Sequence, residues 1–220
     1  MNYTKFNIET WLRREHYNIY EKTINCGFSL TTKIDITNLK RYIDSNGYEF
    51  YPSVIYLLSR VVNTYKEFRF AKKNDELILW DEVHPSFTIF HKDTETFSSL
   101  WCKYSSEITT FMENYHQQLT LHKDNLDLHP QPQQVENVFY VSSLPWVSFD
   151  SFNLNIADIT NVFTPIFTLG KYYSENNKMW LPLAVQVHHA VCDGFHVGQF
   201  LTTLQKLCDE LPISLDYSQS

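Results

Sequence analysis

The chain has 220 residues, of which 43% are hydrophobic and 16% aromatic, so we expect a single globular domain over residues 1–220 with a large core. Its formal net charge is -7 and it has no basic run, which argues against nucleic acid as a partner. Residues 1–20 lack a hydrophobic signal core and no segment approaches the ~20 apolar residues of a membrane span, so we expect no membrane association and a cytoplasmic protein.

The first third of the chain alternates predicted helices and strands. We expect a helix over residues 8–20, a strand over 28–36, and a short helix capped by Thr37 that runs to Tyr42. A further helix begins at Pro52, and its apolar residues follow helical spacing: Val54, Leu57, Leu58, Val61 and Tyr65.

Strands dominate the rest of the chain. Two hairpin-like strands are predicted over 76–80 and 86–90 around a turn at His84-Pro85, followed by a helix over 105–121 and a polar loop over 121–137. Further strands are predicted over 138–142, 152–156, 164–172 and 179–188. A last helix over 195–211 places one apolar face inward: Phe200, Leu204, Leu207, Cys208 and Leu211. This order predicts an α/β (α+β) protein with a mixed sheet covered by helices.

Two adjacent histidines stand in the segment VHHAVCDGFH, residues 187–196. Strand alternation places His189 at the end of the apolar row that contains Leu183, Val185 and Val187, whereas His188 belongs to the opposite row. Asp193-Gly194 then stops the strand and begins a helix. Because an unperturbed imidazole titrates near ~6.5, a histidine at the mouth of a buried strand is a candidate general base.

Other interpretations of this segment remain open from the residues alone. The pair could be one core histidine and one surface histidine. A zinc site is disfavoured because neighbouring strand residues point to opposite faces, and no HExxH or Cys cluster supplies further ligands, so we expect no metal. A Cys192 nucleophile would need hydrogen-bond reach to His189, which sequence adjacency does not supply. The four cysteines are expected to be reduced and buried: Cys26, Cys102, Cys192 and Cys208.

The motif HHAVCDG matches the HHxxxDG pattern of CoA-dependent acyltransferases. Four other segments extend the likeness over nearly the whole chain, so that it resembles the chloramphenicol acetyltransferase family: WLRREHY (11–17), FYPSVIY (50–56), FHKDTETFSSLW (90–101) and VSSLPWVSFDSFNLN (141–155). The resemblance implies the two-layer sandwich of CoA-dependent acyltransferases. It also implies a homotrimer with active sites at the subunit interfaces.

The resemblance further implies that the chain transfers the acetyl group of acetyl-CoA to the primary (3-)hydroxyl of chloramphenicol, which inactivates the antibiotic. Acetyl-CoA is then a co-substrate, and no cofactor is bound permanently. His189 is implied as the general base of a direct reaction in a ternary complex, with Ser142 stabilising the oxyanion and Thr168 holding a water near the transition state. Asp193, paired with Arg13, is implied to support the site rather than to orient the base directly.

Binding residues are implied by the same resemblance. Tyr20, Phe97, Leu154 and Ile156 match the walls of the antibiotic pocket, and Trp146, Lys171 and Tyr172 match residues that bind CoA. Two positions depart from the family. His129 stands where an aromatic pocket residue is expected, and Glu49 stands where a basic residue would help to bind the CoA phosphate. His188 receives no role.

Other acyltransferases and a non-catalytic protein are the alternatives to this prediction. Dihydrolipoamide acyltransferases usually carry DHRxxDG, and condensation domains of peptide synthetases are about twice as long as this chain. An acetyltransferase of the same fold that acts on another hydroxyl compound remains open. A non-catalytic antibiotic-binding protein is disfavoured, because such a protein should have lost at least one member of the set, which is intact: Arg13, Ser142, Thr168, His189 and Asp193.

Overall fold

A mixed β-sheet forms the centre of the computed structural model, which describes residues 2–214 and, in its last helix, side chains up to residue 210. The sheet has seven strands in the described chain. Their order is β2 (Gly27–Asp35), β10 (Lys178–His188), β8 (Ile166–Gly170), β7 (Val138–Leu144), β5 (His84–His91) and β6 (Thr96–Trp101), and β9 (Tyr173–Glu175) also pairs with β10. The β5–β7 and β7–β8 pairs are parallel and the others are antiparallel, so the predicted mixed sheet is confirmed.

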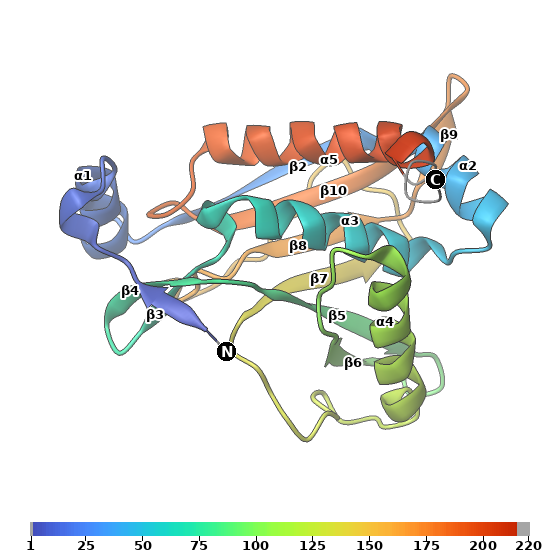
Figure 1. The fold of residues 1–220 in the computed structure, drawn as a ribbon, viewed down its shortest axis with the longest axis horizontal. Helices are drawn as coiled ribbons and strands as arrows, with labels where there is room; N and C mark the ends of the chain where they lie inside the picture. The colour runs from blue at the N-terminus through green and yellow to red at the C-terminus, as the bar shows by residue number, and fades with distance from the viewer. Residues whose placement is uncertain (1, 215–220) are drawn as a thin grey trace.

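Four helices cover one face of this sheet (Figure 1): α2 (Thr37–Asn46), α3 (Phe50–Thr64), α4 (Ile108–His122) and α5 (Gly194–Ser214). The core lies between the two layers. Phe167 of β8 stacks on Phe200 of α5 with ring centroids 5.0 Å apart, and Leu183 of β10 is fully buried. The predicted inward face of α5 is confirmed for Phe200, Leu204 and Cys208. Leu207 is partly buried against the core, and the side chain of Leu211 lies outside the described residues.

A smaller sheet of three strands contains β1 (Tyr3–Lys5), β4 (Glu76–Trp80) and β3 (Phe70–Lys73), which follows the 3-10 turn η3 (Lys66–Phe68). The predicted hairpin between 76–80 and 86–90 is therefore wrong, because β4 and β5 belong to different sheets. β4 pairs with β3 across Asn74-Asp75, whose φ angles of 51° and 60° are those of a tight hairpin turn. His84 and Pro85 lie inside β5, paired with Val138 and Phe139.

The predicted helix over 8–20 is broken into three pieces: η1 (Ile8–Thr10), α1 (Arg14–Asn18) and η2 (Ile19–Thr23), the last a π-helical turn. Trp11 has extended backbone angles, so it separates the first turn from the second. Its indole packs against Phe6 and Phe70 of the core. The apolar residues of this segment are therefore buried by the packing of a bent chain and not by one continuous helix.

The predicted strand over 152–156 is also wrong, because this segment lies in irregular structure on the sheet. Side chains of the sheet bind its backbone in place of a strand partner. Gln186 of β10 accepts from the N–H of Leu154 and donates to its carbonyl, both at 3.1 Å, and Thr31 of β2 accepts from the N–H of Phe152 at 3.2 Å. A segment with an alternating apolar pattern thus packs on the sheet without pairing as a strand.

Smaller differences concern the ends of elements. Thr37 does not cap α2; its N–H and its hydroxyl both donate to Asp35 Oδ1, at 3.0 and 2.6 Å. α2 also runs to Asn46, beyond the predicted end at Tyr42, and α3 begins at Phe50, two residues before Pro52. Four strands escape the sequence analysis altogether: β1, β3, β6 and β9.

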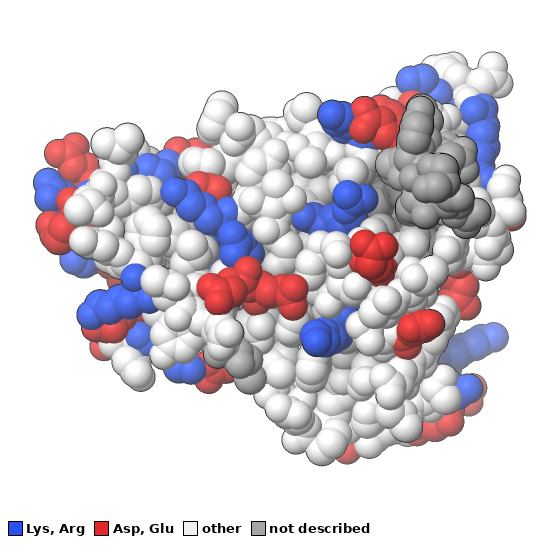
Figure 2. Space-filling model, in the orientation of Figure 1, with Lys and Arg blue, Asp and Glu red and all other residues white. Residues whose placement is uncertain are grey.

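Charged side chains of both signs are interspersed on the face drawn in Figure 2, and no broad basic area appears there. This distribution agrees with the acidic formal charge of the chain. Among the described residues, no helix combines the length and the apolar character that crossing a membrane would require.

Candidate active site

His189 follows directly on the last residue of β10 and lies between two aromatic rings. It stacks on Tyr20 with ring centroids 3.9 Å apart, and Phe28 of β2 meets it edge-on at 5.2 Å. The backbone N–H of His189 donates to the carbonyl of Cys26 at 2.9 Å, which fixes the backbone here. Of the His189 side chain, 28% is exposed. The imidazole is thus held by one stacked and one edge-on aromatic contact and remains partly exposed.

The Nδ1 atom of His189 faces two oxygens. It lies 3.3 Å from the carbonyl of Cys192 and 3.5 Å from Oδ1 of Asp193. Both are acceptors, so they favour the neutral tautomer with its proton on Nδ1. Nε2 then carries the lone pair that a general base requires.

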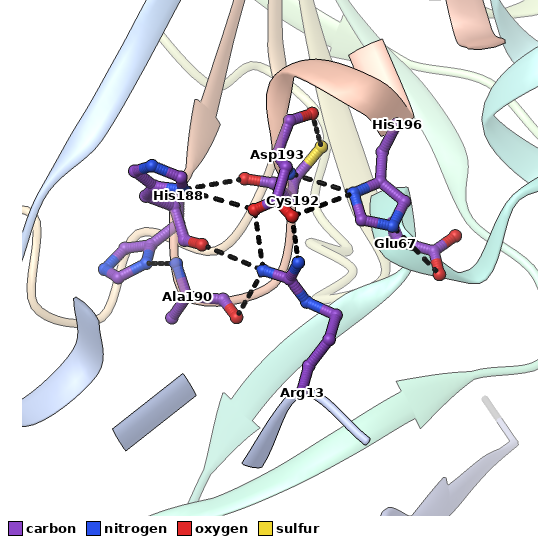
Figure 3. Close-up of polar contacts among 8 residues, drawn as sticks. Arg13, Glu67, His188, Ala190, Cys192, Asp193 and His196 are labelled. Carbon is purple, nitrogen blue, oxygen red and sulfur yellow. Dashed lines mark hydrogen bonds and ion pairs between the residues drawn. The ribbon is translucent and has the colours of Figure 1, made fainter. Parts of the chain in front are cut away.

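Arg13 and Asp193 form an ion pair beside this imidazole. Nη1 of Arg13 bonds Oδ2 of Asp193, and Nη2 donates to Oδ1 at 2.8 Å and to the carbonyl of His189 at 3.4 Å. Burial raises the pKa of Asp193, but the hydrogen bonds and charge of Arg13 outweigh burial and hold it below its ordinary value. The pair therefore ties the start of α5 to the N-terminal segment (Figure 3).

His188 is buried and stacks on Phe163 with ring centroids 4.5 Å apart. Its Nδ1 accepts the N–H of Ala190 at 3.2 Å. Burial lowers its pKa to about 4, against a smaller opposing effect of Glu21. His188 is therefore a neutral core residue at ordinary pH, and the two histidines lie in different surroundings.

The thiol of Cys192 is buried, and its Sγ lies 3.8 Å from the carbonyl of Asp193. Burial raises its pKa far above the ordinary range, which suppresses the thiolate that a nucleophile requires. This geometry does not support a Cys192 nucleophile. Within residues 2–214, no group of three His, Cys, Asp or Glu side chains is arranged to hold a metal ion.

Ser142 and Thr168 lie side by side on neighbouring strands. The strand register aligns Ser142 of β7 with Thr168 of β8, Thr168 with Ala184 of β10, and Ala184 with Thr31 of β2. Residues that pair in this way share one face of a sheet. Leu169 and Leu183, on the other face, meet α3 and α5 in the core, so this row of small side chains lies on the face away from the helices.

A cavity of about 670 Å³ opens at the carboxyl end of β7. It brings together five of the predicted site residues, namely Phe97, Ser142, Trp146, Lys171 and Tyr172. Tyr115 and Leu119 of α4 close one side, and Tyr172 packs against Phe50 with ring centroids 4.8 Å apart. The walls are mainly aromatic and aliphatic, which suits a large ligand with apolar parts.

A second, smaller cavity of about 300 Å³ lies near His189. It contains Leu154 and Ile156, together with Phe28, which also contacts the imidazole. Gln186 lines this cavity and makes two hydrogen bonds to the backbone of Leu154. Its side-chain oxygen also accepts from the hydroxyl of Ser29. Tyr20 is absent from the lining of this cavity but stacks on His189.

His189 and Ser142 are far apart within one chain. Ser142 is level with Ala184, two strands away, whereas His189 follows Ala184 by five residues. At about 3.3 Å per residue this places His189 about 16 Å further along the sheet. The β10–α5 turn accordingly lies beside α1 at one end of the molecule, and β7 points toward the other end, near α4 (Figure 1).

Comparisons with known proteins decide the family. A family model described as chloramphenicol acetyltransferase matches residues 1–205. Chloramphenicol acetyltransferase 3 of Escherichia coli is 54% identical over 209 residues, 95% of this chain and 98% of the relative. The chain belongs to the chloramphenicol acetyltransferase family. Chloramphenicol acetyltransferase 2 of Haemophilus influenzae is 51% identical over 96% of this chain and 99% of its own length.

Solved structures place the fold. One chloramphenicol acetyltransferase has a TM-score of 0.82 at 21% identity and covers 94% of this chain and 100% of its own. A probable dihydrolipoamide acetyltransferase from Listeria monocytogenes reaches a TM-score of 0.64 at 16% identity, with 89% of each chain covered. As a member of the chloramphenicol acetyltransferase family, the chain is an acyltransferase with the α/β fold that the sequence predicted.

The two departures from the family pattern lie on the surface. Glu49 precedes α3, and its carboxylate lies 3.8 Å from Nε2 of His116, next to Phe50 of the larger cavity. His129 is exposed in the segment after α4 and does not line that cavity. The structure thus brings Glu49 close to the predicted CoA-binding residues but does not bring His129 there.

Four residues near the site escape the sequence analysis: Phe28, Glu67, Gln186 and His196. His196 stands within VHHAVCDGFH, so its position in that segment was a usable signal. Phe28 and Gln186 look like ordinary strand residues, because only the register and the fold of residues 150–156 bring them to the site. Glu67 carries no sequence signal that could have found it.

Proposed function

We propose that this chain transfers the acetyl group of acetyl-CoA to the primary (3-)hydroxyl of chloramphenicol. One structural observation carries the proposal beyond family membership. The side chain of His189 is 28% exposed, while its Nδ1 faces two oxygen acceptors. This is the arrangement of a neutral general base.

In this mechanism, His189 accepts the proton of the antibiotic's hydroxyl as that oxygen attacks the carbonyl carbon of the thioester. A C–O bond forms, and the carbonyl oxygen becomes an oxyanion in a tetrahedral intermediate. Collapse of the intermediate breaks the C–S bond, and the CoA thiolate takes the proton from the imidazolium. A thioester is already activated, so no covalent enzyme intermediate is required.

Ser142 is the proposed donor to the oxyanion, since it is a polar residue in the lining of the larger cavity. Thr168, buried beside it in the register, is proposed to hold a water near the transition state. Asp193 and Arg13 support the geometry of the β10–α5 turn. Phe97, Leu154, Ile156 and Tyr20 are proposed to contact the antibiotic, and Trp146, Lys171 and Tyr172 to contact CoA.

The separation of His189 from Ser142 supports an active site shared between subunits. A hydrogen-bonded reaction centre cannot span the distance along the sheet, so His189 of one protomer must meet Ser142 of another. We therefore propose a homotrimer in which each cavity of one copy faces the β10–α5 turn of the next. Acetyl-CoA is a product of cell metabolism, so the same proposal puts the protein in the cytoplasm.

Thiol release from acetyl-CoA, measured with and without chloramphenicol, tests the proposal. Wild-type protein should release thiol only when the antibiotic is present, and His189→Ala should lower that rate by about 100-fold to 10,000-fold. His16→Ala, at an exposed position of α1, serves as the control. Thiol release that ignores chloramphenicol would indicate another hydroxyl acceptor, and binding without release would indicate a non-catalytic protein.

A further inference from the structure

A third histidine of VHHAVCDGFH lies next to the proposed catalytic turn (Figure 3). α5 begins at Gly194, so Asp193 occupies the N-cap position and His196 is the third helical residue. An N-cap aspartate ordinarily accepts a hydrogen bond from the first turn of its helix. Here the two carboxylate oxygens of Asp193 are bonded to Arg13, and the other capping contact is one made to its backbone N–H.

His196 supplies that contact. Its Nδ1 accepts the N–H of Asp193 at 2.9 Å. This is the contact that Glu or Gln makes from the same position in a capping box, where the third residue reaches back to the N-cap N–H. The hydrogen bond fixes the backbone of Asp193 while leaving its carboxylate free for Arg13 and for the Nδ1 of His189.

The contact requires one tautomer of His196. An acceptor at Nδ1 cannot carry a proton, so the neutral ring has its proton on Nε2. Nε2 lies 4.0 Å from Oε1 of Glu67, which follows α3 in the turn η3. Both side chains are largely buried, with 14% of His196 and 13% of Glu67 exposed. The carboxylate thus lies on the side of the ring that carries the proton.

The charged groups around His196 come from three segments. Glu67 and Lys66 face it from η3, Arg13 from the segment before α1, and Asp193 from its own turn. Burial lowers the pKa of His196, and the opposing effect of Glu67 does not restore it. The ring is therefore neutral at neutral pH. Protonation would place a hydrogen on Nδ1 and break the bond to Asp193.

We propose that neutral His196, backed by Glu67, is a positioning residue that holds Asp193 where it can bind Arg13 and face His189. The inference rests on the proposed role of His189 as the general base. The inference adds His196 to His189 as a second group whose protonation lowers activity at acid pH. Activity falls when either imidazole is protonated, because one removes the base and the other releases the turn that positions it.

Two substitutions at His196 distinguish the effect of its hydrogen-bond acceptor from the effect of its titratable ring. His196→Gln keeps an acceptor at the third helical position but cannot be protonated, whereas His196→Leu removes the acceptor. We expect His196→Leu to lower kcat by about tenfold, the size of a lost cap contact, with little change in KM for acetyl-CoA. His196→Gln should retain most of the wild-type kcat. His16→Gln is the matched control at an exposed histidine.

The pH profile of kcat/KM gives a readout that a purely structural role would not move. The acid limb should be steeper in wild type than in His196→Gln, because only wild type loses two deprotonated groups. Glu67→Gln should shift the contribution of His196 to lower pH, because the carboxylate stabilises the protonated ring. Wild-type kcat in a folded His196→Leu, or identical acid limbs in wild type and His196→Gln, would overturn the proposal.

The ring nitrogens provide a test that needs no activity. ¹⁵N chemical shifts of His196, assigned by their loss in His196→Gln, should show an unprotonated Nδ1 and a protonated Nε2 at neutral pH. The opposite tautomer would contradict the inference even if acetyl transfer proceeds as proposed. If wild type shows no antibiotic-dependent thiol release but the tautomer is as expected, the proposed function fails and the His196 contact stands.

Discussion

The turn after β10 and the cavity at the end of β7 carry the proposed chemistry by opposite means. In the turn, Arg13, Asp193, His189 and His196 are joined by directional polar contacts at short distances. In the cavity, Ser142 stands among mainly aromatic and aliphatic walls. A base must be oriented, which directional bonds achieve, whereas a large acyl donor needs apolar area. Substitutions in the turn should therefore mainly affect the rate of acetyl transfer. Substitutions in the cavity, except at Ser142, should mainly affect substrate binding.

The largest departure from this division is expected at Ser142. Ser142→Ala should lower kcat by about 100-fold or more, because a preorganised donor to the oxyanion is lost. The KM for acetyl-CoA should change little. Ser143→Ala, at the next residue of the same cavity, is the matched control. Equal losses in the two variants would show that the effect comes from the cavity wall and not from an oxyanion contact.

The buried histidine beside the turn should make stability depend on pH. In the folded chain the pKa of His188 is lowered to about 4. In the unfolded chain its pKa is near ~6.5, so between these two pH values only the unfolded chain binds the proton. Stability should fall as pH drops from 6.5 towards 4, with a contribution of about 3 kcal/mol from this residue. Urea unfolding at fixed protein concentration measures the effect.

His188→Asn is the informative variant, because its amide oxygen can still accept from Ala190 but does not titrate. Its stability should depend less steeply on pH than that of wild type. His84, whose pKa burial also lowers to about 4, continues to contribute in both proteins. An unchanged pH dependence in His188→Asn would refute the assignment of this residue as a buried neutral histidine.

The ion pair of the turn should show strong coupling. Arg13→Ala or Asp193→Ala alone leaves a partly buried charge without its partner and should cost about 2 kcal/mol of unfolding free energy. The double variant should cost less than the sum of the two. Arg14→Ala removes the exposed pair with Glu9 and should cost about 0.5 kcal/mol or less. Additive effects of the first two substitutions would show that the pair contributes no coupling energy.

The smallest effect is expected in the apolar cavity. Trp146→Ala removes a half-exposed indole that packs edge-on against Phe90, and it should raise the KM for acetyl-CoA by about tenfold with little change in kcat. Initial rates at varied acetyl-CoA measure both constants. A fall in kcat with an unchanged KM would contradict the assignment of Trp146 to binding.

Much of the fold could be predicted because it depends on local pattern. The long apolar rows of β10 and the regular spacing of α3 and α5 identify these elements directly. Prediction failed where tertiary contacts decide. The segment 152–156 has a strand-like pattern, yet side chains of Thr31 and Gln186 bind its backbone. Residues 8–20 have a helical pattern, yet Trp11 turns into the core and breaks the helix.

The candidate site was assigned in a different way. The residues alone singled out His189, and the family resemblance added Ser142 and Thr168, which the strand register places side by side. No pattern along the chain could show that His189 lies far from Ser142, because that separation follows from the order and the register of the strands in the sheet. Glu67 was likewise out of reach, since η3 meets the turn only in the folded chain.

The bracing of residues 152–156 by Gln186 has a consequence for how the protein can change. A strand in the sheet would have to keep its alternation, because a shift of one residue would exchange its two faces. The backbone of Phe152 and Leu154 is held by side chains that belong to the sheet, so these hydrogen bonds do not depend on the side chains of Leu154 and Ile156. Substitutions at these two positions can therefore reshape the smaller cavity, the proposed site of antibiotic contacts, while these hydrogen bonds to the sheet stay the same.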